Sequence, residues 1–362
     1  MTSSSRLTLP VRLEDLVALL FFLLNLLLRI IFRGLEGGNF SPADVLIIIP
    51  AVTLLLAKEL VHYFVAGKPG PAGGSAGPGD FVRPFWEILR DWFPFLIILL
   101  MYYSLWGDAT LLMVTKDRDQ ALIALDQRLF GFQASLVLQR IISPGLTAWM
   151  AFAYFFHVIN IPLVACFLYA RRPRARFREM MSGLMVVTFL GLMGYLLVPA
   201  IGPIYTLRDQ YTVPLHQALG VFNREVDFMN FARIHRDVFP SLHVAISFVV
   251  WLYAYRNSKK LFWILSPLIL SLWFSTLYLR YHYLIDVVAG LILAPLSYLL
   301  ANWLFRRFGE IPVSVAIPAI WAERLWHGRP APIHQGPGHD LTREGSPRHE
   351  KVDGPQKVED GQ

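Results

Sequence analysis

Long blocks of apolar residues constrain this sequence more than any other feature. A helix of about 20 apolar residues crosses the hydrocarbon core of a bilayer, and a helix is one of the few structures that can do so. About eight segments approach that length, namely 13–32, 45–65, 92–112, 146–170, 180–200, 240–255, 261–279 and 283–305. The pattern predicts an all-α polytopic membrane protein with about eight transmembrane helices.

Composition and charge agree with this prediction. Hydrophobic residues make up 55% of the chain and charged residues 16%, whereas soluble domains average about 25% charged. The single cysteine, Cys166, excludes a disulfide framework and a cysteine-based zinc site. The net charge of +7 could indicate nucleic-acid binding, but in a membrane protein a basic excess more often marks cytoplasmic loops. We therefore expect no nucleic-acid partner, and the absence of metal-ligand and nucleotide motifs predicts no metal and no cofactor.

Basic residues fall in alternate loops of the predicted topology. They cluster at 171–178, 256–260 and 306–307, each directly after an apolar segment. Because arginine and lysine concentrate in cytoplasmic loops, this pattern predicts that both termini are cytoplasmic and that the opposite loops face the periplasm or a lumen. With no organelle address in the sequence, we expect a bacterial inner membrane.

The chain is predicted to have four regions. They are an N-terminal two-helix membrane unit at 1–66, a Gly/Pro-rich linker at 67–80, a catalytic six-helix membrane core at 81–310 and a largely disordered cytoplasmic tail at 311–362. Within the core, 114–139 mixes charged and apolar residues at helical spacing, which predicts an amphipathic helix lying in the membrane interface.

Three ionisable residues at predicted helix ends are the first candidates for chemistry, because such residues are costly near lipid. His243 lies in Phe239-Pro-Ser-Leu-His243, where Pro240 suits the first turn of a helix. His282 and Asp286 are four residues apart, which predicts that they share one helical face. The charge topology brings all three to the same membrane surface.

Their chemistry suits phosphoryl transfer. A carboxylate bonded to one imidazole nitrogen fixes the tautomer and raises the nucleophilicity of the other nitrogen, and a second histidine can protonate a leaving oxygen. The alternative is that His282 and Asp286 only satisfy each other while His243 caps a helix. Spacing alone does not decide, since His349 and Asp353 in the polar tail have the same spacing.

The residues around these candidates carry a family resemblance. Pro240-Ser-Leu-His243 and the segment from Ser275 to Asp286 resemble the second and third motifs of the type 2 phosphatidic acid phosphatase superfamily, and are closest to its inositol phosphorylceramide synthase branch. The resemblance covers about 92–305. Weaker similarities lie earlier in the chain, in the same order as in the family, at Asp126 with Gly131, His157 with Pro162, and Gly194 with Pro199.

The resemblance implies a six-helix phosphatase-type core and a role for each motif residue. His282 would be the nucleophile, Asp286 its orienting acid, and His243 the general acid for the leaving group and then the base for the acceptor. Ser241 and the backbone N–H groups at the opposite helix start would hold phosphate oxygens. The family implies a phospholipid donor and a lipid-alcohol acceptor, such as phosphatidylinositol and ceramide, without a metal.

The sequence also departs from the phosphatase members of the family. The phosphatase members have a lysine seven residues before an Arg-Pro pair, and this sequence has no lysine at that spacing. They also have an arginine six residues before the motif histidine, and here Thr276 occupies that position relative to His282. These losses argue against a phosphatase that binds a dianionic phosphate. Arg280 is a candidate replacement, although on an ideal helix it would point about 200° away from His282; the alternative is an interfacial arginine. Further candidate substrate contacts are Thr276, His157 and Tyr205, with Arg208, Arg233 and Arg236 as other possible phosphate ligands.

The predicted function is therefore a membrane phosphotransferase that passes a phosphorylated headgroup, such as phosphoinositol, to a lipid alcohol through a phosphohistidine. A lipid phosphate phosphatase, with water as the acceptor, is the alternative of the same chemistry. A lipid transporter or scaffold is the alternative of another class, for which the helix-breaking residues of 191–203 would suit a transport path. The intact His–His–Asp set favours an enzyme, and the sequence indicates no oligomeric state.

Overall fold

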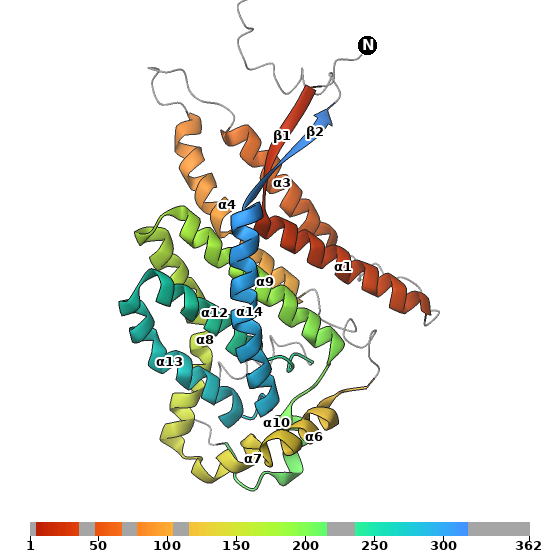
Figure 1. Ribbon diagram of the computed structural model, residues 1–362, viewed down its shortest axis with the longest axis vertical. Helices are drawn as coiled ribbons and strands as arrows, with labels where there is room; N and C mark the ends of the chain where they lie inside the picture. Colours follow the sequence, from red (N-terminus) through yellow and green to blue (C-terminus); the bar gives the residue numbers. More distant parts are fainter. Residues whose placement is uncertain (1–4, 36–47, 67–77, 104–115, 216–235, 318–362) are drawn as a thin grey trace, which may run out of the picture. The chain divides into compact units, whose positions relative to one another are not determined.

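The computed structural model describes residues 5–35, 48–66, 78–103, 116–215 and 236–317. By its contacts the chain divides into a unit of residues 8–315 and a second unit formed by the two chain ends. The first unit holds every helix and every site residue described below. Figure 1 shows its helices, which are α1 (Leu13–Leu35), α3 (Ile48–Ala66), α4 (Pro78–Tyr103), α6 (Asp119–Phe130), α7 (Ala134–Leu138), α8 (Pro144–Arg171), α9 (Arg174–Leu197), α10 (Pro203–Thr206), α12 (Leu242–Asn257), α13 (Lys259–Tyr278) and α14 (Leu284–Phe308).

The all-α polytopic fold is confirmed, with fewer qualifying spans than the about eight predicted. Among the described residues, four helices are long and apolar enough to cross a membrane, α8, α9, α13 and α14, or up to five if the bent pair of α6 and α7 counts as one span. The other four predicted segments correspond to α1, α3, α4 and α12. Helix α12 has 16 residues, which is shorter than the about 20 that a span requires.

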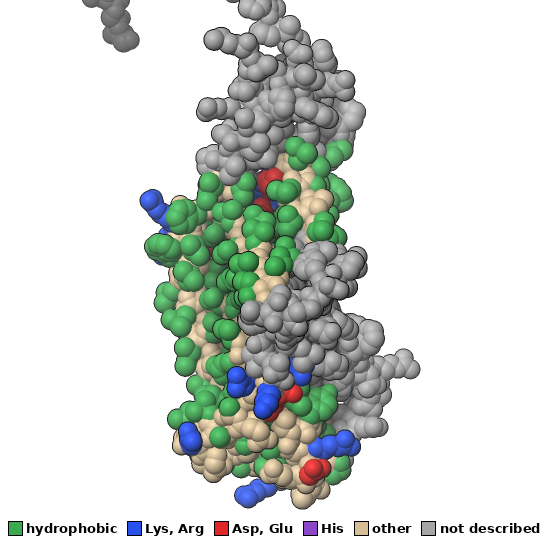
Figure 2. All heavy atoms as spheres, turned by 90° about the vertical axis from the view of Figure 1, so that its right-hand side faces the viewer, with side chains coloured by type: hydrophobic (Ala, Val, Ile, Leu, Met, Phe, Trp, Pro, Cys, Tyr) green, Lys and Arg blue, Asp and Glu red, His purple; other side chains and the backbone are tan. Residues whose placement is uncertain are grey.

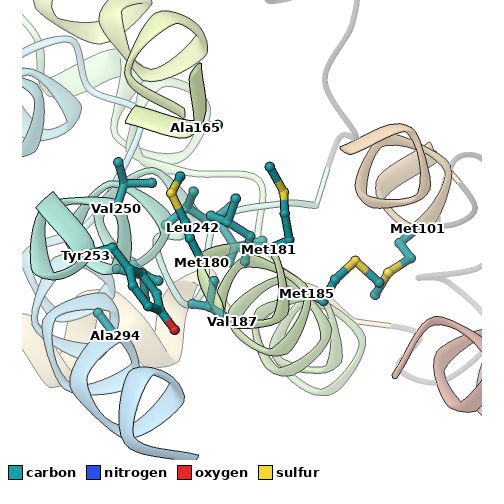
Figure 3. Close-up of a cluster of buried hydrophobic side chains, with 14 of the residues drawn as sticks. Met101, Ala165, Met180, Met181, Met185, Val187, Leu242, Val250, Tyr253 and Ala294 are labelled. Carbon is teal, nitrogen blue, oxygen red and sulfur yellow. The ribbon is translucent and has the colours of Figure 1, made fainter. Parts of the chain in front are cut away.

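Helix α12 is the centre of the core, because it packs against α8, α9, α13 and α14. Methionines of α9 fill the space beside it: Figure 3 shows Met180 and Met181 close to Leu242, while Met185 reaches toward Met101 of α4. Flexible, unbranched methionine side chains fill irregular gaps between helices well. The start of α12, which carries His243, is thus held from several sides.

Helices α1, α3 and α4 pack on one another, α1 and α4 also pack against α9, and buried ion pairs join this part of the chain. The pairs are Arg12 with Asp91 at 2.7 Å, Lys58 with Asp15 at 2.5 Å and with Glu59 at 3.3 Å, Arg90 with Glu59 at 2.7 Å, and Arg178 of α9 with Glu14 at 3.5 Å. Most of these side chains are almost fully buried. Breaking such a pair would leave an uncompensated buried charge, so the cluster fastens these helices to α9.

Two local features differ from the prediction. The single interfacial helix expected over 114–139 is two helices, α6 and α7, bent by 73°. The bend follows Gly131, whose φ of 79° lies in the left-handed region that glycine adopts without strain. In addition, strands β1 (Ser5–Arg12) and β2 (Glu310–Ile317) form a two-stranded sheet, so the tail predicted from 311 begins with ordered strand.

The division into four regions stays a prediction. Residues 67–77 of the expected linker and the tail beyond 317 lie outside the described residues, and α4 already begins at Pro78. Figure 2 shows hydrophobic side chains over the middle of one face of the molecule, with most of the Lys and Arg side chains drawn there near its lower end. This distribution suits a protein whose middle is embedded in lipid.

Candidate active site

His282 lies in a tight turn between α13 and α14. Helix α13 ends at Tyr278 and α14 begins at Leu284. The carbonyl oxygen of Thr276 accepts the backbone N–H groups of both Tyr281 (3.0 Å) and His282 (3.1 Å), and Arg280 has a φ of 67°. The expectation that His282 and Asp286 share a helical face is wrong, because His282 precedes the helix, with Tyr283 as the N-cap between them.

The turn nevertheless brings His282 and Asp286 together. Nδ1 of His282 lies 3.5 Å from Oδ2 of Asp286, and the two side chains are only 3% and 0% exposed. The same carboxylate oxygen accepts the backbone N–H of Tyr283 at 2.8 Å, which completes a capping box at the start of α14. The helix start therefore fixes the position of the carboxylate that faces the imidazole.

His243 comes to the same place on the neighbouring helix. Ser241 is the N-cap of α12, and its backbone N–H donates to the carbonyl oxygen of Asp286 at 3.0 Å. The ring centroids of His243 and His282 are 5.7 Å apart. Gly290 permits this close approach of α12 and α14, because a Cβ atom there would lie 2.6 Å from the carbonyl oxygen of Ser241.

Helix α8 adds two aromatic residues to this pair. The ring of His157 is 4.6 Å from that of His243, and Tyr154 stacks on His243 at 4.6 Å. Buried Nδ1 of His157 and buried Oγ of Ser241 have no hydrogen-bond partner among the described residues. Both atoms are thus available for hydrogen bonding to a bound molecule.

Arg280, another candidate phosphate ligand, lies in the turn before α14. Arg280 is 7% exposed, and its guanidinium lies 3.8 Å above the ring of Tyr211 and donates to the carbonyl oxygen of Val213. Burial lowers the pKa of this guanidinium. The helical-wheel argument for the direction of Arg280 does not apply, because the residue lies in the turn and not in a helix.

Thr276 and Tyr205 have different surroundings. Thr276 is fully buried, and its hydroxyl donates to the carbonyl oxygen of Trp273 at 2.7 Å, so its observed contribution is the backbone carbonyl that holds His282. Tyr205 lies on α10 and is 49% exposed. Among the arginine alternatives, Arg208 is exposed and Arg236 pairs with Asp117 at 2.5 Å, while position 233 lies outside the described residues.

Two acids of α6 were not predicted to take part. Asp126 accepts the backbone N–H groups of Leu284 (3.0 Å) and Ile285 (2.8 Å). Asp119 accepts the hydroxyl of Tyr283 at 2.7 Å. Burial raises the pKa of this phenol, which therefore stays protonated and able to donate. Since the first amides of α14 are occupied in this way, phosphate oxygens would have to find their donors elsewhere.

Several helices have the length and hydropathy of membrane spans. Two histidines and an aspartate meet at adjoining helix starts. Together these features define a polytopic membrane protein with a His–His–Asp site. The family model described as the PAP2 superfamily matches residues 120–300, half of the chain. The chain belongs to this superfamily and is an integral membrane protein.

A curated relative is similar to part of the chain. Phosphoinositol dihydroceramide synthase of Bacteroides thetaiotaomicron is 28% identical over 178 residues, which is 45% of this chain and 57% of the relative. The chain thus matches little more than half of that protein's length. The similarity supports the predicted resemblance to the inositol phosphorylceramide synthase branch. No solved structure matches the chain significantly.

Proposed function

We propose that this protein is a membrane phosphotransferase that moves a phosphorylated headgroup from a phospholipid to a lipid alcohol. The observation that carries the proposal is the convergence of His282, backed by Asp286, with His243 on the adjoining helix. The relative's name supports phosphoinositol as the headgroup and a ceramide-type lipid as the acceptor. A bacterial inner membrane, a site on the periplasmic side and cytoplasmic termini are parts of the same proposal.

The first step forms a phosphohistidine. Asp286 accepts a hydrogen bond from the Nδ1–H group of His282, which fixes the tautomer and leaves the Nε2 lone pair free to attack phosphorus. A P–N bond forms while the P–O bond to diacylglycerol breaks. His243, in its protonated form, donates a proton to the leaving oxygen, so diacylglycerol departs as a neutral alcohol.

The second step reverses these roles. His243, now neutral, takes the hydroxyl proton of the lipid alcohol as that oxygen attacks phosphorus, and the P–N bond to His282 breaks. His282 and His243 return to their starting protonation states. We expect His157 to contact the lipid hydroxyl; its Nδ1 has no hydrogen-bond partner among the described residues and its ring is 4.6 Å from that of His243.

Phosphate oxygens are held from the α12 side of the site. Ser241 Oγ is available, and the first-turn N–H groups of a helix have no intrahelical partners and favour anions. The corresponding amides of α14 are taken by Asp126. Arg280, two residues from His282 in the chain, is the basic residue that we propose as a further phosphate ligand.

The alternative is a lipid phosphate phosphatase, in which water replaces the alcohol. Thr276, which is fully buried, occupies the position where the phosphatase members of the family have an arginine. A dianionic phosphate would lack that basic ligand here, which argues against the phosphatase. The chemistry up to the phosphohistidine would be the same. The two proposals therefore differ in the acceptor and in the phosphorylated donor.

The test is headgroup transfer by purified protein in defined micelles, with phosphatidylinositol offered with and without ceramide. We expect ceramide-dependent release of diacylglycerol, and its loss in His282→Ala. Release of inorganic phosphate from phosphatidic acid would favour the phosphatase instead. Equal signals from wild type and His282→Ala on every lipid would refute both.

A further inference from the structure

The face of α6 that is buried in the protein is acidic. Its buried residues are Asp119, Leu122 and Asp126, whereas Leu125 and Leu129 are 37% and 59% exposed. Positions three and seven residues apart share a helical face. Burying a carboxylate is costly unless it is hydrogen-bonded, so the partners of these two acids indicate why they are there.

Asp126 holds the first turn of α14. Its two carboxylate oxygens accept the N–H groups of Leu284 and Ile285 at 3.0 and 2.8 Å. These amides belong to the helix start, which lacks intrahelical partners for its N–H groups and favours a negative charge. Both lie between His282 and Asp286 in the chain.

Asp119, two helical turns earlier, holds the residue next to His282. It accepts the hydroxyl of Tyr283 at 2.7 Å and the backbone N–H groups of Ile201 (3.0 Å) and Gly202 (2.8 Å). The hydroxyl of Tyr283 also lies 2.6 Å from that of Thr206. One face of α6 therefore fixes residues 283–285 and joins them to the loop before α10.

We infer that Asp126 and Asp119 are positioning residues that fix the segment carrying His282 and Asp286. Their role in turnover rests on the proposed function, while their hold on the segment stands by itself. Without Asp126, the first turn of α14 would lose two of its hydrogen bonds, and the 3.5 Å approach of His282 to Asp286 would no longer be fixed. A misplacement of about 1 Å at a reacting centre can lower the rate about 100-fold.

The activity test compares Asp126→Ala, Asp126→Asn and Tyr283→Phe in full-length protein. We expect kcat to fall about 100-fold in Asp126→Ala with an unchanged KM, because substrate contacts stay while the nucleophile is displaced. Asp126→Asn keeps one acceptor oxygen and should recover part of kcat. Tyr283→Phe, which removes only the hydroxyl held by Asp119, should lower kcat less. Asp209→Asn, which removes the same charge from an exposed position on the short 3-10 helix Arg208–Gln210, should behave as wild type.

Hydrogen–deuterium exchange gives a readout that does not depend on turnover. In Asp126→Ala, peptides that cover 282–287 should exchange faster, while peptides of α8 and α9 should not change. Unchanged exchange at 282–287, or a full wild-type kcat in a folded Asp126→Ala protein, would overturn the inference. If wild type were inactive on every lipid, the proposed function would fail, and the exchange result would still support or overturn the hold of Asp126 on the segment.

Discussion

The carbonyl oxygen of Asp286 accepts the backbone N–H of Ser241 at 3.0 Å. This one hydrogen bond joins the starts of α12 and α14, and thus the two sequence motifs that carry the histidines. Because the side chain of the same aspartate faces His282, a shift of either helix start would alter the nucleophile and its orienting acid together.

Replacing His282 should remove the covalent intermediate. After incubation with donor labelled in its phosphate and an alkaline quench, wild type should carry an acid-labile label and His282→Asn none, because the asparagine has no nucleophilic ring nitrogen. The matched control is His349→Asn, since His349 also has an acid four residues later; it should label as wild type does. Label retained in His282→Asn would place the nucleophile elsewhere.

Replacing His243 should slow the departure of the leaving group. Positioned general acids contribute about 10²–10⁴-fold, so we expect His243→Gln to lower diacylglycerol release by a factor in that range. A donor whose leaving group needs no proton, such as a nitrophenyl phosphodiester, should recover most of the first step. An equal loss with both donors would argue that His243 has a structural role only.

Arg280 should contribute to binding of the phosphate. A hydrogen bond to a charged group contributes about 1.5–3 kcal/mol, so Arg280→Ala should lower kcat/KM about 10- to 100-fold. Arg280→Lys should not restore it, because an ammonium group lacks the planar fork of the guanidinium. Tyr211→Leu, which removes the ring beneath the guanidinium, should have a smaller effect. Steady-state kinetics with all three variants would show this order; a wild-type Arg280→Ala would contradict it.

Gly290 should be needed for stability. The alanine Cβ would lie 2.6 Å from the carbonyl oxygen of Ser241 and 3.1 Å from Cβ of Val244, and overpacking of this kind costs about 1–3 kcal/mol. Thermal unfolding in detergent should therefore show a lower Tm for Gly290→Ala. Gly145→Ala is the matched control on α8, where a Cβ would meet nothing within 4 Å. Equal Tm values for the two variants would show that the helices separate without cost.

Much of this arrangement was predictable, and the failures have physical causes. Hydropathy located the helices, and the motifs located His243, His282 and Asp286. The turn before α14 was missed because a spacing of four residues fits both a helix face and a helix start. The bend at Gly131 depends on the conformation of one residue.

The contribution of α6 could not be predicted from local sequence. Asp119 and Asp126 bond to residues about 160 positions later in the chain, and periodicity carries no information about partners at that distance. The local signals were their spacing of seven on one face of an amphipathic helix and, for Asp126, the weak family similarity shared with Gly131. The spacing could have indicated a shared buried partner, although not which one.

The charged cluster between the N-terminal helices and α9 has a consequence for dissecting the chain. Among the buried side chains that the structure describes there, the segment before α8 supplies three cations, Arg12, Lys58 and Arg90, and four anions, Glu14, Asp15, Glu59 and Asp91. These anions outnumber the cations by one, and α9 contributes further cations: Arg178 lies 3.5 Å from Glu14 and Arg174 lies 3.9 Å from Asp91. A fragment that holds Arg12, α1, α3 and α4 but not α9 would lack these counter-ions, so we expect separate expression of these helices to require α9 or substitute cations.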